Sequence, residues 1–180
     1  QKYLLIMKTI KPKEFISQVL IDELSEIHLK HPYISFAIMA IGIEFLGKCL
    51  NNKRDWNFTK KGQSKKDFEN AIKRLGSLEK YRPYLESHKL YNALRNGFAH
   101  SFVPKGTITL SSKKEMPHMK VHEGKLNLKC EDFFIDFKGA CSEVINMSFP
   151  ETNKMNKPLL IVPDNPDNTP IPNSNLNTVI

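Results

Sequence analysis

Apolar residues recur every three or four positions along five segments of the chain, a spacing that gathers them on one face of an α-helix. The expected helices cover residues 13–30, 33–51, 65–75, 86–99 and 132–147. Pro12 suits a first helical turn, and Pro32 should end the first helix. Ser64 and Asp132 are suitable N-caps for the third and fifth helices.

The second predicted helix is apolar on nearly every side, which is typical of a helix at the centre of a bundle. Ala37, Ala40 and Gly47 form a narrow stripe where another helix can approach closely. Glu44 lies in the same stripe, and burying a lone carboxylate is costly unless a partner neutralises it. Two interpretations stay open. Glu44 either fixes the helix register through an ion pair or hydrogen bond, or orients Arg95 or His100 at a site.

The pattern changes after the fourth predicted helix. Segments 119–122 and 126–130 flank Glu123 and Gly124, which predicts a small β-hairpin just before the last helix. We therefore expect a mainly α fold, a helical bundle of about five helices with one small hairpin, formed by residues 1–150.

Residues 151–180 read as a Pro/Asn-rich C-terminal tail that we expect to be partly disordered. From residue 158 onward it holds five prolines, five asparagines and no lysine or arginine. Within the tail, only residues 159–162 are apolar enough to pack on the domain or to pair as a strand.

Charge and cysteine usage narrow the class of protein. The formal charge is +8, and the first 157 residues hold all 27 basic side chains but only 17 of the 19 acidic ones, a balance of +10. Such a domain attracts polyanions, nucleic acid most commonly, although the same charge can serve solubility alone. The three cysteines form no CxxC pair, which argues against a disulfide framework and for a reducing compartment. No run approaches the roughly 18 apolar residues of a membrane span, so we expect a cytoplasmic protein without a membrane partner.

Loop 51–64 mixes basic and aromatic side chains. Its candidate nucleic-acid-binding residues are Arg54, Trp56, Lys60 and Lys61. Basic and aromatic side chains together can hold a single strand of nucleic acid through phosphate contacts and base stacking. The alternative is that the aromatic residues pin the loop onto the core.

The candidate chemistry lies in residues 90–102, where Arg95, Asn96 and His100 follow one another near the end of the fourth predicted helix. Cleavage of an RNA phosphodiester needs a group that takes the 2′-hydroxyl proton, a cation on the phosphate and a polar group that positions them. Histidine titrates near neutrality and suits the proton transfer. Arginine stays charged and grips phosphate through two donors. Because the nucleophile belongs to the substrate, we expect neither a metal ion nor a cofactor.

The spacing of these residues is compatible with a site that two copies of the chain share in a homodimer. Arg95 and His100 are five positions apart, about 140° around an ideal α-helix, so they do not share a face. Asn96 and His100 are four apart and do share one. Two copies packed about a two-fold axis would line a single cleft with both sets.

Residues 95–100, Arg-Asn-Gly-Phe-Ala-His, resemble the motif of the HEPN superfamily, in which an arginine and a polar residue precede a histidine by this spacing. The resemblance extends more loosely to residues 13–148, including the helix with Glu44. It implies a dimerising helical domain that cleaves RNA without a metal, in a toxin–antitoxin or defence system, with an antitoxin or another protein as a further partner. His100 would be the acid/base group, Arg95 the phosphate ligand and Asn96 the positioning group.

The alternative is a non-catalytic HEPN-like module that binds nucleic acid or a partner protein. Arg95 would then pair with Glu44, and His100 would cap the C-terminal end of its helix. Geometry distinguishes the two hypotheses, because catalysis requires Arg95 and His100 to face an open basic cleft.

Overall fold

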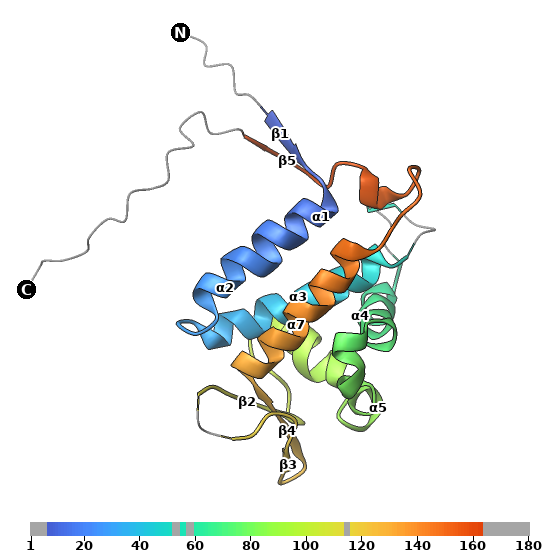
Figure 1. Ribbon diagram of the computed structural model, residues 1–180. Helices are drawn as coiled ribbons and strands as arrows, with labels where there is room; N and C mark the ends of the chain where they lie inside the picture. The colour runs from blue at the N-terminus through green and yellow to red at the C-terminus, as the bar shows by residue number, and fades with distance from the viewer. Residues whose placement is uncertain (1–6, 52–54, 57–59, 114–115, 164–180) are drawn as a thin grey trace, which may run out of the picture.

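The computed structural model describes residues 7–51, 55–56, 60–113 and 116–163. Its fold is mainly helical, with a three-stranded sheet and a two-stranded ribbon (Figure 1). The predicted mainly α class is confirmed, whereas the HEPN-like identity of the bundle stays a prediction.

The first helix of the bundle is built from three successive segments. These are α1 (Pro12–Phe15), the π-helical η1 (Ile16–Glu23) and α2 (Leu24–Ile27). Pro32 was predicted to end this helix, but the helix already ends at Ile27. Pro32 is instead the first residue of α3 (Pro32–Cys49), where a missing N–H group costs nothing because no helical partner exists for it.

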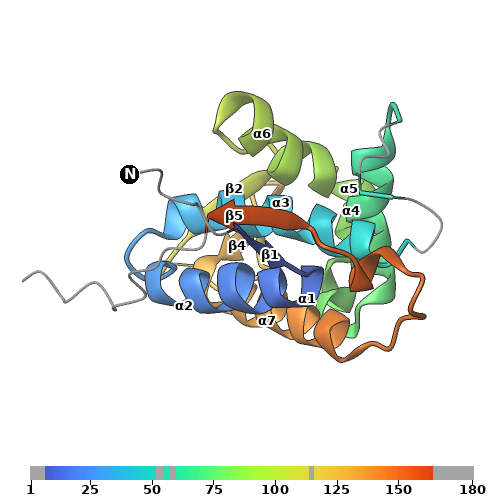
Figure 2. The same ribbon diagram turned by 90° about the horizontal axis from the view of Figure 1, so that it is seen from above.

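Helix α3 lies at the centre of the molecule and packs against α4 (Gln63–Arg74) and α7 (Cys130–Asn146) (Figures 1 and 2). The predicted close approach at Gly47 is confirmed, because an added Cβ there would lie 1.6 Å from the Asp67 carbonyl oxygen of α4. On the α7 side, a Cβ at Gly42 would lie 2.5 Å from the Phe137 ring. Glycine at these two positions lets both neighbours pack directly against the α3 backbone.

Helix α3 is also long and apolar enough, by length and composition, to cross a membrane. Its 18 residues have a mean hydropathy of 1.3, which corrects the expectation that no run approaches such a span. Half of this segment is buried inside the protein, and central helices of globular bundles pass the same test. The helix is therefore weak evidence for a membrane partner, and the expected absence of one stays a prediction.

Two predicted boundaries around α4 and the following helix were wrong. Helix α4 begins two residues earlier than expected. Its N-cap is Gly62 rather than Ser64, and the φ of 77° at Gly62 is a left-handed conformation that favours glycine. The helix expected over 86–99 is broken at Lys89, whose φ is 47°. After η2 (Gly76–Tyr81), the observed segments are α5 (Tyr84–Ser87), the π-helical η3 (Tyr91–Asn96) and α6 (Gly97–Ser101).

The predicted hairpin is confirmed, with Glu123 and Gly124 at positive φ in its turn. Its strands are β3 (Val121–His122) and β4 (Lys125–Lys129). A third strand, β2 (Ile108–Ser111), pairs in parallel with β4, so that the sheet order is β2-β4-β3. Helix α7 follows β4 directly. Its N-cap is Lys129, and the predicted cap Asp132 instead pairs with the Lys129 side chain at 3.0 Å.

The two ends of the described chain meet in the ribbon. Strand β1 (Met7–Ile10) pairs antiparallel with β5 (Leu160–Pro163), which confirms that residues 159–162 contain a strand. Between α7 and β5, the short 3₁₀ helix η4 (Lys154–Asn156) buries Met155 in the core. The first part of the predicted tail thus packs on the bundle, and residues from 164 onward lie outside the described residues.

Candidate functional site

Arg95 is held in place by two neighbours. Its guanidinium forms an ion pair with Glu44 of α3, and it lies 5.9 Å from the centre of the Tyr91 ring on its own helical segment. Both side chains of the ion pair are 18% exposed, so the pair lies at the boundary between core and solvent. Glu44 thus contacts Arg95, which is the pairing that the non-catalytic alternative expects. Neither Arg95 nor His100 lines the cavity beside Pro32 and Tyr33 or the cavity between Lys65 and Asn92.

The helix around Arg95 is π-helical from Tyr91 to Asn96 and α-helical from Gly97 onward. A π-helix joins residues five apart by its hydrogen bonds, so the angle of about 140° calculated for an ideal α-helix does not apply to this segment. Such π-helical turns are rare and frequently occur at functional sites. Here the π-helical turn ends at the candidate motif.

His100 lies on the exposed side of α6, and Asn96 is partly buried. Among the described residues His100 makes no hydrogen bond or ion pair. The helix ends in Phe102, which adopts φ 55° and whose carbonyl oxygen accepts a hydrogen bond from the Tyr33 hydroxyl. The helix therefore closes through a left-handed residue and not through a His100 cap, and the imidazole is free to meet a ligand.

Large apolar side chains are exposed beside the motif. Phe102 is 70% exposed, Val103 follows it, and Tyr33 packs edge-on against Phe98 beneath them. Ile34 and Ile41 are also half exposed and lie seven residues apart on α3, and therefore on one face of that helix. Figure 2 shows α6 and the α1–α2 helix on opposite sides of α3. We use the name α3–α6 apolar face for the exposed apolar side chains of α3 and of the segment that follows α6, which are Tyr33, Ile34, Ile41, Phe102 and Val103.

The candidate residues of loop 51–64 have different surroundings. Trp56 stacks on Phe45 with ring centres 5.5 Å apart, and the Lys154 amine lies 4.8 Å from its ring centre. Trp56 therefore fixes the loop to the core, and base stacking by this residue stays a prediction. Lys60 and Lys61 are exposed just before α4, and Arg54 lies outside the described residues.

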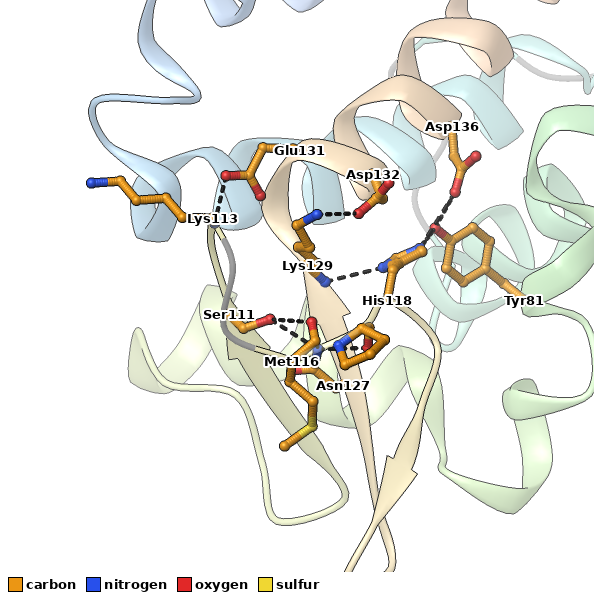
Figure 3. A network of polar contacts seen from close by, with 11 residues as sticks. Tyr81, Ser111, Lys113, Met116, His118, Asn127, Lys129, Glu131, Asp132 and Asp136 are labelled. Carbon is orange, nitrogen blue, oxygen red and sulfur yellow. Dashed lines mark hydrogen bonds and ion pairs between the residues drawn. The ribbon is translucent and has the colours of Figure 1, made fainter.

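A second polar cluster, which the sequence did not indicate, joins the sheet to α7 (Figure 3). The Tyr81 hydroxyl donates to Asp136 at 2.6 Å and lies 2.8 Å from His118 Nε2. On its other side, His118 Nδ1 accepts a hydrogen bond of 3.0 Å from the Lys129 N–H group. Nδ1 therefore carries no proton, and the neutral ring holds its hydrogen on Nε2. We call Tyr81, His118 and Asp136 the sheet–helix network.

The network is closed to solvent and electrostatically balanced. The side chains of His118 and Asp136 are 9% and 11% exposed, and Lys80 adds a 2.8 Å ion pair to Asp136. Burial acts to raise the pKa of the Asp136 carboxyl, but hydrogen bonds from His118, Lys80 and Tyr81 outweigh it and hold that pKa below its usual range. Burial beside Asp136 raises the pKa of Tyr81 far above that of a free phenol. These residues consequently act as structural anchors.

Asn127 of β4 extends this anchoring to the loop before the hairpin (Figure 3). Its buried amide nitrogen lies 2.8 Å from the Ser111 hydroxyl and 3.0–3.1 Å from the carbonyl oxygens of Met116 and Pro117. The i, i+4 spacing of His118 and His122 resembles a zinc pair only on a helix, and here His122 lies on strand β3. In the described ranges, no group of three or more His, Cys, Asp or Glu side chains is arranged to hold a metal ion.

The three cysteines are free and buried. Burial raises the pKa of the Cys49 and Cys130 thiols to about 12, so neither is a thiolate near neutral pH. Cys130 donates weakly to the carbonyl oxygens of His28 and Pro32 at the turn before α3. These thiols act as packing residues.

Comparisons with protein-family models, with curated proteins and with solved structures found no match. The resemblance to the HEPN superfamily accordingly rests on residues 95–100 and on the helical character of the bundle.

Proposed function

We propose that this protein is a metal-independent endoribonuclease of the HEPN type whose active site is shared by two copies of the chain. The observation that carries the proposal is the combination of a fixed Arg95 with an exposed His100 five residues later, directly beside the exposed α3–α6 apolar face. A cytoplasmic toxin–antitoxin or defence role follows from the same resemblance and belongs to this proposal.

In this mechanism His100 of one copy removes the proton from a ribose 2′-hydroxyl, and the oxygen attacks the adjacent phosphorus. A bond forms between O2′ and phosphorus while the bond from phosphorus to O5′ breaks. His100 of the second copy donates a proton to the leaving O5′, so that charge is balanced and a 2′,3′-cyclic phosphate results. Arg95 stabilises the negative charge on the phosphate oxygens, and Asn96 positions the reacting groups.

The dimer is expected to bury the α3–α6 apolar face. Large apolar side chains exposed on α3 and just after α6 favour an interaction site, and a two-fold axis here would bring two α6 helix ends together. Ile34→Glu and Phe102→Glu should each shift a dimer toward monomer in analytical ultracentrifugation. Ile135→Glu, at a residue 66% exposed on α7, is the matched control and should leave the association unchanged. A wild-type monomer at all concentrations would contradict this arrangement.

The catalytic proposal is tested by cleavage of end-labelled structured RNA in excess EDTA. Wild type should cleave, and His100→Ala and Arg95→Ala should each lose most of the activity while their urea unfolding midpoints confirm a folded state. Mixing the two inactive variants should not restore the activity, because a mixed dimer holds only one His100 and the mechanism uses the imidazoles of both copies. Cleavage that is indifferent to both substitutions would overturn the assignment.

The ion pair itself favours a second candidate function. Glu44 neutralises Arg95 in the free protein, which suits a module that binds nucleic acid or a partner protein without cleaving it. RNA binding without cleavage, unaffected by His100→Ala, would support this alternative.

A further inference from the structure

A cavity of about 130 Å³ opens on the side of the bundle where α4 and α5 lie near each other (Figure 1). This volume is roughly ten times the 10–15 Å³ that one water molecule requires. The residues that line the cavity come from α4, α5 and the start of η3. They are Lys65, Leu85, Glu86, Lys89, Tyr91 and Asn92.

The polar side chains of this cavity favour an anion. Lys65 and Lys89 approach from separate elements, and Asn92 adds an amide that can donate hydrogen bonds. Glu86 is the carboxylate of the lining, and Lys65 also lies 3.6 Å from Glu69 in an exposed pair of the kind that contributes little. Beside Lys65, three more exposed lysines occupy positions 60, 61 and 66. Two lysines and one carboxylate therefore line the cavity.

The backbone at Lys89 supports the same conclusion. Its φ of 47° is an uncommon conformation for a residue with a side chain, and it occurs where the chain breaks between α5 and η3. Residues held in such conformations cluster at ligand-binding sites. The break directs the chain so that Lys89, Tyr91 and Asn92 all line the cavity.

Tyr91 connects the cavity to the candidate active site. Tyr91 is one of the residues that line the cavity, its ring centre lies 5.9 Å from the Arg95 guanidinium, and the ring packs edge-on against Phe68 of α4 at 5.6 Å. The ring is thus a fixed wall shared by the cavity and Arg95. Arg95 and the two cavity lysines therefore share Tyr91 as a neighbour.

We propose that this cavity binds a backbone phosphate of single-stranded RNA and so sets the register of the strand across Arg95. The register part of this proposal rests on the proposed ribonuclease function. Lysine binds phosphate as a point charge without reading a base, so the site favours a phosphodiester backbone of any sequence. Lys65 and Lys89 are the principal ligands, and Asn92 completes the donor set.

The test measures binding of a fluorescein-labelled 12-nucleotide RNA by anisotropy in EDTA at several salt concentrations. All variants carry His100→Ala, so that cleavage does not consume the probe. The test variant is Lys65→Ala with Lys89→Gly, because glycine tolerates the left-handed backbone at that position. The control is Lys125→Ala with Lys138→Ala, which removes the same charge from exposed positions outside the cavity lining.

We expect the test variant to bind about tenfold more weakly than the control variant. Its plot of log affinity against log salt should be shallower by about 0.7, the value of one lost phosphate contact on a single strand. Glu86→Gln should strengthen binding, because it removes the opposing carboxylate. Equal losses in test and control variants would overturn the proposal, since the lysines would then act only as general surface charge.

Two further measurements separate this inference from the proposed function. Inorganic phosphate should compete with RNA for the protein that carries His100→Ala alone, at concentrations that leave RNA binding by the test variant unaffected. Equal competition in both proteins would overturn the site. In protein that retains the native His100, the substitutions of Lys65 and Lys89 should move the preferred cleavage position on a structured RNA. Lysine-dependent binding without any cleavage would retain the phosphate site and reject the ribonuclease. Cleavage together with RNA binding that does not depend on these lysines would retain the ribonuclease and reject the phosphate site.

Discussion

The sheet–helix network and the Arg95 region contain similar residue types in opposite surroundings. In the network, His118 has a partner on each ring nitrogen and is nearly closed to solvent. In the Arg95 region, Glu44 fixes the arginine at the edge of the core, and the nearby His100 is exposed beside apolar surface. A histidine whose hydrogen bonds are complete holds the fold together, whereas one without partners in the free protein is available for a substrate.

The largest expected effect is a difference in the free energy of unfolding between variants of the two histidines. We expect His118→Ala to lower the free energy of unfolding by about 3 kcal/mol, because it leaves the buried Lys129 N–H group and the Tyr81 hydroxyl short of a partner. His100→Ala should change it by less than about 0.5 kcal/mol. Urea unfolding followed by the fluorescence of Trp56, the single tryptophan, measures both.

Tyr81→Phe separates hydrogen bonding from packing in the same network. It keeps the ring that packs edge-on against Phe133 at 5.4 Å and removes only the hydroxyl. The free energy of unfolding that Tyr81→Phe loses is therefore the hydrogen-bonding part of the network's contribution, and it belongs to the first prediction. Equal stabilities of His118→Ala and His100→Ala would show that the network does not anchor the sheet.

An effect of intermediate size is expected on stability at low pH. The folded pKa of Asp136 is lowered, so its stabilisation is complete above the unfolded value of about 3.9 and is lost as the pH falls through the folded pKa. Glu143 behaves alike, because the N–H groups of Gly76 and Ser77 donate to its carboxylate at 2.8 and 2.7 Å and outweigh the effect of burial. The free energy of unfolding should fall from about pH 5 downward. The stability gap between wild type and Asp136→Asn should narrow by about pH 2, and a constant gap would contradict the assignment.

A smaller loss of stability than in the sheet–helix network is expected at Glu44. Glu44→Gln should lower the free energy of unfolding by about 1 kcal/mol, since the ion pair with Arg95 is partly hydrated. RNA cleavage should fall about tenfold if the carboxylate orients the guanidinium. Glu79→Gln, in the exposed pair with Arg82, is the control and should alter neither quantity. A change in stability with unaltered cleavage per folded molecule would show that Glu44 only fixes the helix register.

Sequence periodicity predicted the helices of the bundle, because the spacing of apolar residues along a helix decides which of its faces is buried. It therefore located α3, the close approach at Gly47 and the buried face of α7. It missed the break at Lys89, where no glycine or proline announces the positive φ. It also missed the parallel pairing of β2 with β4, since that contact has no turn signal between its strands.

The candidate site shows the same limit. The motif at 95–100 was visible because its residues are close in sequence, and the pairing of Glu44 with Arg95 was anticipated as one of two alternatives. Tyr81, His118 and Asp136 lie on three separate elements, and only the folded chain brings them together. The cavity lysines were hidden for the same reason, although Lys60 and Lys61 pointed to the neighbouring surface.

The pairing of β1 with β5 has a consequence for synthesis of the chain. About 150 residues separate Ile10 from Leu160, so the first strand emerges from a ribosome long before its partner exists. At about 5–20 residues per second, the delay amounts to about 8–30 s. During that time the backbone N–H and C=O groups of β1 remain an open edge that can recruit another nascent chain. The ribbon that joins the two ends is thus the last part of the molecule to become native.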